Sequence, residues 1–377
     1  MAGLWLSADD FRETRKPLAE ASGMPCQMYL DPEVFALEKE RIFKREWLFA
    51  GHVCRIRNAN DYFTLTLLDH PLVITRGADG KVRAFHNVCR HRGMIVAKGE
   101  GNTRSFVCPY HAWSYDTGGR LIAAPEMGGV ACFDKAQSPL VEVRSEIVQG
   151  IIFVNLDGKA APLSESIPDL IALMSPWNIE EMEPAYVSEI SGTFNWKTMV
   201  ENASEAYHVL ATHRESFHGI SPAERSYSTD NAGRAWTDLF TPYVRADAMP
   251  SGPLIPGVPG WASERLSFYG LHPNFLISLA ADSIIIYHTT VEGPESTRFT
   301  WTMYAPPSMK AWDGYDAYMS EMGPWMDQVN REDLGSCEGV HRGMKSSGWR
   351  PGRYSLLEKP VWQFHNWYLD RMLGPES

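Results

Sequence analysis

The sequence predicts an α+β protein of two domains, in which a small all-β domain precedes a larger domain that combines an antiparallel β-sheet with flanking helices. From about Asp61 to Leu156, short β-type runs alternate with turn signals. Beyond Asp157, longer helical stretches are mixed with β-runs. The 377 residues are enough for two domains of ~100–200 residues each.

The first domain is placed at residues 46–156. Glycines in Ala78-Asp79-Gly80 and in Thr117-Gly118-Gly119 supply the backbone freedom that tight hairpin turns need. The expected strands are Tyr62–Leu68, Leu72–Arg76, Gly80–Phe85, Arg104–Val107, Leu121–Ala123 and Gly150–Asn155.

The second domain is placed at residues 157–377 and begins with the proline-containing linker Lys159–Pro168. The helical pattern of Pro32–Arg45 fits packing on either domain, and we group residues 1–45 with the second. Expected helices are Trp196–His213, Lys310–His341 with interruptions, and Val361–Leu373, and expected strands are Phe275–Glu292 and Thr297–Tyr304.

The composition excludes several classes of protein. The net charge of −11 argues against a nucleic-acid or anionic-membrane partner and would attract a basic redox partner. No run approaches the ~18 apolar residues of a membrane span, and charges interrupt the N-terminal stretch where a signal peptide would be apolar. The six cysteines are too scattered to suggest a disulfide framework. We therefore expect a cytoplasmic protein.

Two short loops of the first domain each offer one thiolate and one imidazole. Cys89 and His91 form a C-x-H motif, and Cys108 and His111 form a C-x-x-H motif shortly after it. A tetrahedral zinc site accepts the same four ligands, and so does a two-iron cluster with two cysteines on one iron and two histidines on the other. The ligand count alone leaves both open.

The second domain carries another candidate metal site. His208 and His213 follow the acidic residue Glu205, and two imidazoles plus one carboxylate form the facial triad of non-haem Fe(II) oxygenases. Five residues of regular α-helix would turn ~500° and place the two rings ~140° apart. We therefore predict a π-bulge or a helix break between the two histidines.

Together the two motifs resemble the α subunit of the aromatic-ring-hydroxylating, Rieske non-haem iron oxygenases, from about Tyr29 to the C-terminus. This resemblance implies a Rieske [2Fe-2S] cluster, mononuclear Fe(II), and a catalytic domain of the helix-grip type. It implies that the ligands of the cluster are Cys89, His91, Cys108 and His111.

The resemblance also implies a carboxylate ligand in a late acidic helix, here within Asn330–Glu338. We expect Asp333 to join His208 and His213 as the third iron ligand. Asp327, Glu332 and Glu338 are the alternatives.

Glu205 occupies the family's bridging position, so it would lie near His208 and reach His111 of a neighbouring subunit. Most ring-hydroxylating members have aspartate at this position, and members that act on quaternary amines have glutamate. The residues around His208 and His213 look more like the ring-hydroxylating branch, so the substrate class stays open between aromatic rings and quaternary amines.

By the same resemblance, the protein is the terminal oxygenase of a multicomponent system and forms a homotrimer. It would use O2 and electrons from a separate NAD(P)H-dependent reductase or ferredoxin to hydroxylate a small organic substrate, inserting one or both oxygen atoms. The chain has no flavin or NAD fingerprint and no plant-type ferredoxin cysteine set, so the reductase is expected to be another polypeptide. The chain length resembles that of members without a β subunit. The alternative is a Rieske electron carrier without oxygenase activity.

Overall fold

The computed structural model describes residues 7–230, 234–245, 247, 249 and 252–374. The chain forms two compact units, Arg45–Glu165 and Met1–Lys44 with Ser166–Ser377, and each is described by itself. Within the described residues, no helix has the length and apolar character needed to cross a membrane.

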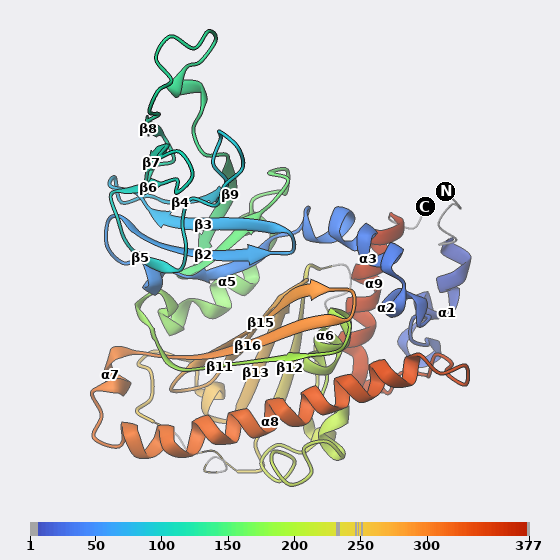
Figure 1. Cartoon of the computed structure of the whole chain (residues 1–377). Helices are drawn as coiled ribbons and strands as arrows, with labels where there is room; N and C mark the ends of the chain where they lie inside the picture. The colour runs from blue at the N-terminus through green and yellow to red at the C-terminus, as the bar shows by residue number, and fades with distance from the viewer. Residues whose placement is uncertain (1–6, 231–233, 246, 248, 250–251, 375–377) are drawn as a thin grey trace. The chain divides into compact units, whose positions relative to one another are not determined.

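The unit Arg45–Glu165 is built almost entirely from antiparallel strands (Figure 1). Seven strands form one sheet in the order β1-β10-β9-β4-β3-β2-β5, and three form a small second sheet in the order β6-β7-β8. The strands are β1 (Leu48–His52), β2 (Asp61–Leu67), β3 (His70–Arg76), β4 (Val82–His86), β5 (Glu100–Asn102), β6 (Ser105–Val107), β7 (Ser114–Asp116), β8 (Leu121–Ala123), β9 (Glu142–Val148) and β10 (Ile151–Asn155).

Both predicted glycine turns of this unit are present. Gly80 between β3 and β4 has φ +78°, and Gly119 between β7 and β8 has φ +84°. A Cβ on Gly119 would lie 2.5 Å from the ring of Phe85, so this turn needs glycine for space as well as for conformation.

The larger unit contains a six-stranded antiparallel sheet in the order β11-β16-β15-β14-β13-β12. Its strands are β11 (Glu183–Gly192), β12 (Trp236–Pro242), β13 (Arg265–Leu271), β14 (Phe275–Leu279), β15 (Ile284–Gly293) and β16 (Ser296–Ala305). The main helices are α3 (Pro32–Glu38), α5 (Pro168–Met174), α6 (Trp196–Ser204), α8 (Tyr315–Met344) and α9 (Lys359–Leu373). Shorter helical segments include α1 (Arg12–Arg15), α2 (Gln27–Leu30), η3 (Lys39–Phe43), α4 (Leu163–Ser166, across the boundary between the units), η8 (Tyr207–Leu210), η10 (Gly260–Ser263), α7 (Pro307–Lys310) and η11 (Leu356–Glu358).

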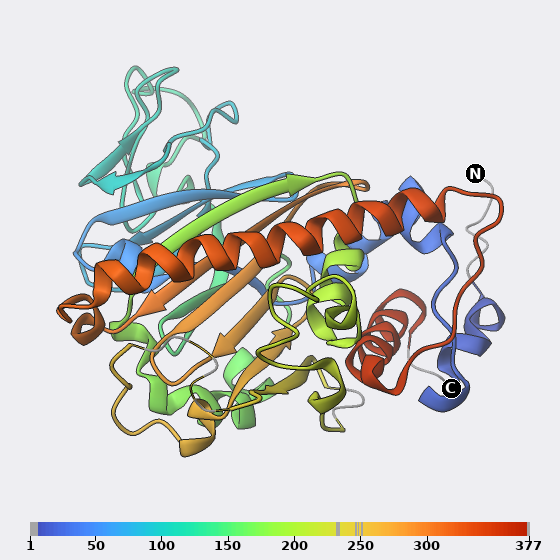
Figure 2. The same ribbon diagram turned by 90° about the horizontal axis from the view of Figure 1, so that it is seen from below.

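The long helix α8 crosses the sheet of this unit (Figures 1 and 2). Its buried face, including Tyr318, Met322 and Met326, packs in one apolar cluster with Phe299 and Trp301 of β16. This packing fixes α8 as one wall of the space above the sheet, and residues on its inner face can therefore contribute to a site there.

The N-terminal segment packs within the larger unit. Asp31 caps α3 by accepting a hydrogen bond from the backbone N–H of Glu33. At the end of α3, the fully buried carboxylate of Glu38 pairs with the ammonium of Lys197 on α6 and accepts a 2.8 Å hydrogen bond from Trp196 Nε1. These contacts join the first helices of the chain to the helix that leads into the histidine motif.

The structure corrects three of the predicted elements. The helix expected over Trp196–His213 ends at Ser204. The run Phe275–Glu292 is a hairpin of β14 and β15 rather than one strand. The interruption expected in Lys310–His341 falls between α7 and α8, after which α8 continues unbroken past Pro324 to Met344.

Candidate iron centres and substrate pocket

The break in the histidine motif lies at Glu205, before His208, and not only between the two histidines as predicted. Glu205 adopts an extended conformation with φ −133° and ψ 166°. Its carboxylate accepts hydrogen bonds from the backbone N–H groups of Tyr207 and His208, the second at 3.1 Å, which are the first two residues of the short helix η8. The extended backbone of Glu205 thus ends α6, and its side chain binds the start of the segment that carries His208.

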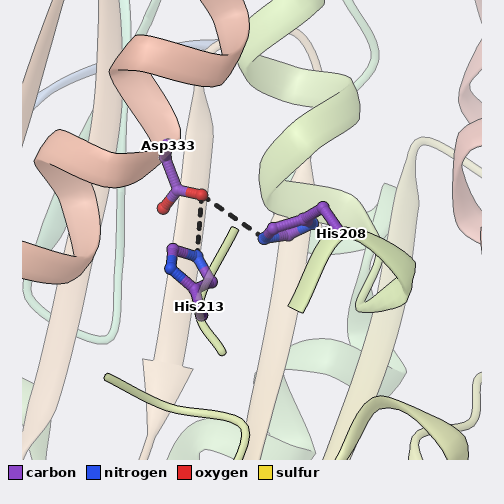
Figure 3. Close-up of side chains that lie close together, drawn as sticks. All are labelled: His208, His213 and Asp333. Carbon is purple, nitrogen blue, oxygen red and sulfur yellow. Dashed lines mark hydrogen bonds and ion pairs between the residues drawn. The ribbon is translucent and has the colours of Figure 1, made fainter. Parts of the chain in front are cut away.

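His208, His213 and Asp333 converge at one point, as Figure 3 shows. Asp333 Oδ1 on α8 lies 2.9 Å from Nε2 of His213 and 3.3 Å from Nε2 of His208. The three ligand atoms lie within 4.8 Å of one another. Two imidazoles and one carboxylate at this spacing fit a divalent iron with open coordination positions.

Each histidine of this triad has a second carboxylate on its other ring nitrogen. Glu205 Oε1 lies 2.7 Å from Nδ1 of His208, and Glu332 Oε2 lies 2.8 Å from Nδ1 of His213. A carboxylate at Nδ1 favours a proton there and leaves Nε2 as the metal-binding atom, the arrangement common around metal-ligating histidines.

The four acidic candidates of the late helix have different partners. Asp333 is the one that reaches both histidines, while Glu332 contacts only His213 and does so at Nδ1. Asp327 Oδ2 accepts a 2.7 Å hydrogen bond from Tyr186, and Glu338 Oε1 accepts one of 3.1 Å from the backbone N–H of Thr193. The other three carboxylates therefore make contacts that do not reach the Nε2 atoms of the two histidines.

The electrostatics of the triad favour a positive charge at its centre. Burial lowers the pKa of His208, but hydrogen bonds to Asp333 and Glu205 outweigh burial and raise it to about 10. The pKa of His213 is raised for the same reason, with burial opposed by Asp333 and Glu332. Burial raises the pKa of Asp333, and the two histidines reverse this and lower it. A divalent cation would supply the same positive charge and displace the protons.

The two Cys-His loops of the other unit have matching backbone geometry. The N–H of Cys89 donates to the carbonyl of Met94 at 2.8 Å, and the N–H of Cys108 donates to that of Trp113 at 2.8 Å. The residue four positions after each cysteine has a positive φ, +78° at Gly93 and +57° at Ala112. Two loops of the same shape thus present their side chains as a pair.

The cysteines and the histidines of these two loops differ in their exposure to solvent. Cys89 and Cys108 are buried, whereas His91 and His111 are exposed and their Nδ1 atoms lie 3.2 Å apart. This separation fits a cluster in which one iron takes two thiolates and the other takes two imidazoles. Tyr115 was missed by the sequence reasoning: its hydroxyl lies 3.4 Å from Sγ of Cys89. Its place in the strand that follows the second loop was the only available signal.

A cavity of about 180 Å³ lies beside the triad, between the sheet and α8. Its aromatic lining includes Phe217, Tyr243, Phe268, Tyr287, Phe299 and Trp325. Among the described lining residues, the carboxylates are those of Glu205, Asp282 and Asp333, and there is no lysine or arginine. This lining comes from separate strands, helices and loops that lie far apart in the sequence, and no sequence motif marks it.

The fold and the two donor sets define a Rieske-type oxygenase. Residues 46–134 match the family model of the Rieske [2Fe-2S] domain, and residues 179–374 match that of the ring hydroxylating alpha subunit, catalytic domain. The chain belongs to this α-subunit family and is the terminal oxygenase of a Rieske system. The predicted family, fold class, enzyme class and pair of iron cofactors are confirmed.

The chain has relatives named for quaternary ammonium substrates and a relative named for an aromatic substrate. It is 30% identical to the glycine betaine monooxygenase oxygenase subunit of Chromohalobacter salexigens, over 93% of this chain and 86% of that protein. It is 36% identical to the 2-aminobenzenesulfonate 2,3-dioxygenase subunit alpha of Alcaligenes sp, over 76% of this chain and 72% of that protein. A crystal structure of a quaternary ammonium Rieske monooxygenase in complex with an inhibitor superposes with a TM-score of 0.81, 25% identity and coverage of 93% and 96%.

Proposed function

We propose that the protein oxygenates a quaternary ammonium compound. The observation that carries this proposal is the lining of the cavity beside the triad, which combines aromatic rings with carboxylates and has no lysine or arginine among its described residues. Aromatic faces and carboxylates attract a methylated ammonium group, the first by cation–π contact. Relatives that are named as glycine betaine and quaternary ammonium monooxygenases support the same class.

The competing substrate class is an aromatic sulfonate, as in the name of the Alcaligenes relative. A sulfonate in an apolar pocket needs a guanidinium, an ammonium or several N–H donors to offset its desolvation. The described lining offers carboxylates instead, which would repel a substrate of net negative charge such as an aminobenzenesulfonate, whereas a betaine carries a compensating ammonium group. Glutamate rather than aspartate at position 205 also favours the quaternary amines.

In this proposal His208, His213 and Asp333 hold the mononuclear iron, and Cys89, His91, Cys108 and His111 hold the cluster. Bound iron would supply O2 binding and activation at the positions that three protein ligands leave open. The chain's own contribution is to orient the two imidazoles through Glu205 and Glu332. The apolar wall of the cavity keeps bulk water from the substrate.

Electron delivery in this proposal uses a separate reductase and a homotrimer. The exposed imidazoles of His91 and His111 can meet another protein surface. Glu205, which contacts His208, is proposed to link the iron site to His111 of a neighbouring subunit. Residues 46–156 would then serve as the cluster domain, and residues 1–45 with 157–377 as the catalytic domain. The cytoplasmic location stays a prediction of the sequence.

The test is substrate-dependent O2 consumption by the iron-loaded protein with a surrogate reductase and NADH. The panel contains choline, glycine betaine and carnitine on one side, and 2-aminobenzenesulfonate and unsubstituted aromatic rings on the other. We expect oxygen uptake and an oxidised amine product with at least one quaternary ammonium compound. Uptake coupled only to aromatic compounds would overturn the proposal.

A further inference from the structure

Asp282, in the turn between β14 and β15, places a buried carboxylate in the wall of the substrate cavity. Its side chain is 4% exposed and lines the cavity. Oδ2 accepts hydrogen bonds from the backbone N–H of Gly252 at 2.7 Å and from the hydroxyl of Tyr318 at 3.2 Å, and Oδ1 accepts one from Ser283 Oγ at 2.8 Å. Three donors leave part of the acceptor capacity of a carboxylate unused.

Within the described part of the chain, the hydrogen-bond partners of Asp282 are Gly252, Tyr318 and Ser283, and none of them is cationic. Burial of a carboxylate without a counter-ion is unfavourable because the charge loses its hydration, so a cationic ligand that pairs with Asp282 would offset this cost. The nearby aromatic groups are Tyr318 and Tyr243. The pKa of each phenol is raised, mainly by burial and then by the negative charge of Asp282.

The carboxylate lies at the end of the cavity remote from the iron ligands. Tyr318, which contacts it, is fifteen residues before Asp333 on α8, or about 22 Å along the helix axis at 1.5 Å per residue. The same cavity is lined between these two positions by Met322, Met326 and Val329, one apolar face of the helix.

A lining residue near this remote end is exposed to solvent. Leu254, a lining residue, is 58% exposed. The backbone N–H of its neighbour Ile255 donates to the carbonyl of Ala281 at 2.8 Å, which places this exposed segment directly beside Asp282. The carboxylate therefore lies beside an exposed edge of the cavity lining.

We propose that Asp282, with the rings of Tyr243 and Tyr318, forms an outer cation subsite that admits substrates with a quaternary ammonium group and repels substrates whose net charge is negative. This inference rests on the proposed function, since it assigns the first capture of the quaternary ammonium charge, before the substrate reaches the iron site, to a named group. The subsite lies too far from His208, His213 and Asp333 to take part in oxygen chemistry. Asp282 is a specificity-determining residue and not a catalytic one.

The test compares a cation with its neutral carbon isostere. Calorimetry under anaerobic, unreduced conditions measures the binding of choline and of 3,3-dimethylbutan-1-ol to the iron-loaded protein and to the Asp282→Asn variant. We expect the variant to bind choline about tenfold more weakly, as loss of one buried charge contact predicts, with the affinity for the alcohol unchanged. An equal loss for both ligands, or no loss for either, would overturn the subsite.

Two further variants separate charge from structure. Asp282→Glu keeps the charge and should restore most of the preference for choline. Asp238→Asn removes an equally buried carboxylate, bonded to Thr229, that does not line the cavity, and should leave both affinities unchanged. Retention of the Rieske absorption spectrum and of the melting temperature checks that each variant is folded.

The kinetic form of the test uses whichever quaternary ammonium compound is turned over. Asp282→Asn should raise its KM with kcat within about twofold of the wild type, because the subsite acts on capture and not on chemistry. If none is turned over, the proposed function fails. The calorimetric preference for choline over its isostere still decides whether the subsite exists.

Discussion

Glu332 and His213 form a hydrogen-bonded pair that sets the direction of the iron-binding nitrogen. Oε2 of Glu332 lies 2.8 Å from Nδ1 of His213, and the same carboxylate accepts hydrogen bonds from Ser216 Oγ at 2.5 Å and Gln328 Nε2 at 3.0 Å. The ring is thereby held with Nε2 towards Asp333, 2.9 Å away. An outer carboxylate held by two further hydrogen bonds is a rigid support for a metal ligand.

Replacing Glu332 with alanine should weaken Fe(II) binding by about 10–100-fold, because the ring of His213 loses its orientation and its basicity. Competition with a coloured chelator measures this affinity, and the Rieske absorption serves as an internal reference. Glu338→Ala is the matched control, since that carboxylate lies on the same helix and contacts the backbone of Thr193 instead. Equal iron affinity in the two variants would contradict the orienting role.

Replacing Asp333 or His208 with alanine should abolish turnover and leave the Rieske spectrum intact. Iron content should fall from about three to about two atoms per chain, since only the mononuclear site loses a ligand. Asp327→Ala removes a carboxylate of the same helix that accepts a hydrogen bond from Tyr186 of β11, and this variant should retain all of its iron. Full activity in the Asp333 variant would exclude this residue as a ligand.

Replacing Glu205 with glutamine should slow electron transfer to the mononuclear site while both metal centres remain. The amide keeps the size of the side chain and loses the negative charge next to Nδ1 of His208. Single-turnover kinetics, followed by the bleaching and return of the Rieske absorption, measures the rate. Glu201→Gln, on α6 and bonded to Tyr29 and His365, is the control that should react at the wild-type rate.

Removing one partner of the Glu38–Lys197 pair should destabilise the larger unit by about 3–5 kcal/mol, because the other charge is left buried and unpaired. Both side chains are fully buried. Lys197→Met and Glu38→Leu should each lower the urea midpoint of the circular dichroism transition. The double variant should recover much of the loss, and additive losses would contradict a paired role.

His272 should make the larger unit sensitive to acid. Burial lowers its pKa to about 3, with a smaller contribution from Arg371 on α9. Between this value and its ordinary pKa of 6.5, the unfolded chain binds a proton that the folded protein does not. Stability should therefore fall as the pH falls through this range, by up to about 1.4 kcal/mol per pH unit.

His272→Gln removes this titration and should flatten the dependence of the urea midpoint on pH between 3 and 6.5. Above about pH 7.5 the urea midpoints of the wild type and of the variant should differ by a constant amount, which provides the internal control. Parallel curves across the acidic range would assign the acid sensitivity to other groups.

Local spacing in the sequence was sufficient to predict the two metal-binding motifs and the fold class. Cys89 with His91, and Cys108 with His111, lie in short loops where separation along the chain limits separation in space. Near Asp157 the sequence pattern changes from short strands separated by turns to a mixture of helices and strands. This change is visible because apolar residues recur about every 3.6 residues in a helix and every two residues in a strand. Both are local properties of the chain.

The position of the helix break was predicted only in part. Helical spacing placed the distortion between His208 and His213, whereas α6 already ends at Ser204, and the Glu205 side chain binds the backbone N–H groups of Tyr207 and His208. Periodicity cannot distinguish such a residue from a glutamate inside a helix.

The choice of the third ligand and the character of the cavity depended on tertiary structure. Asp333 lies 120 residues after His213, and its neighbour Glu332 differs from it in direction by about 100° around α8. Only the packing of α8 on the sheet decides which of the two carboxylates faces Nε2. Asp282 reaches the same cavity from a hairpin turn, and its isolation from any described cation is likewise a property of the folded chain alone.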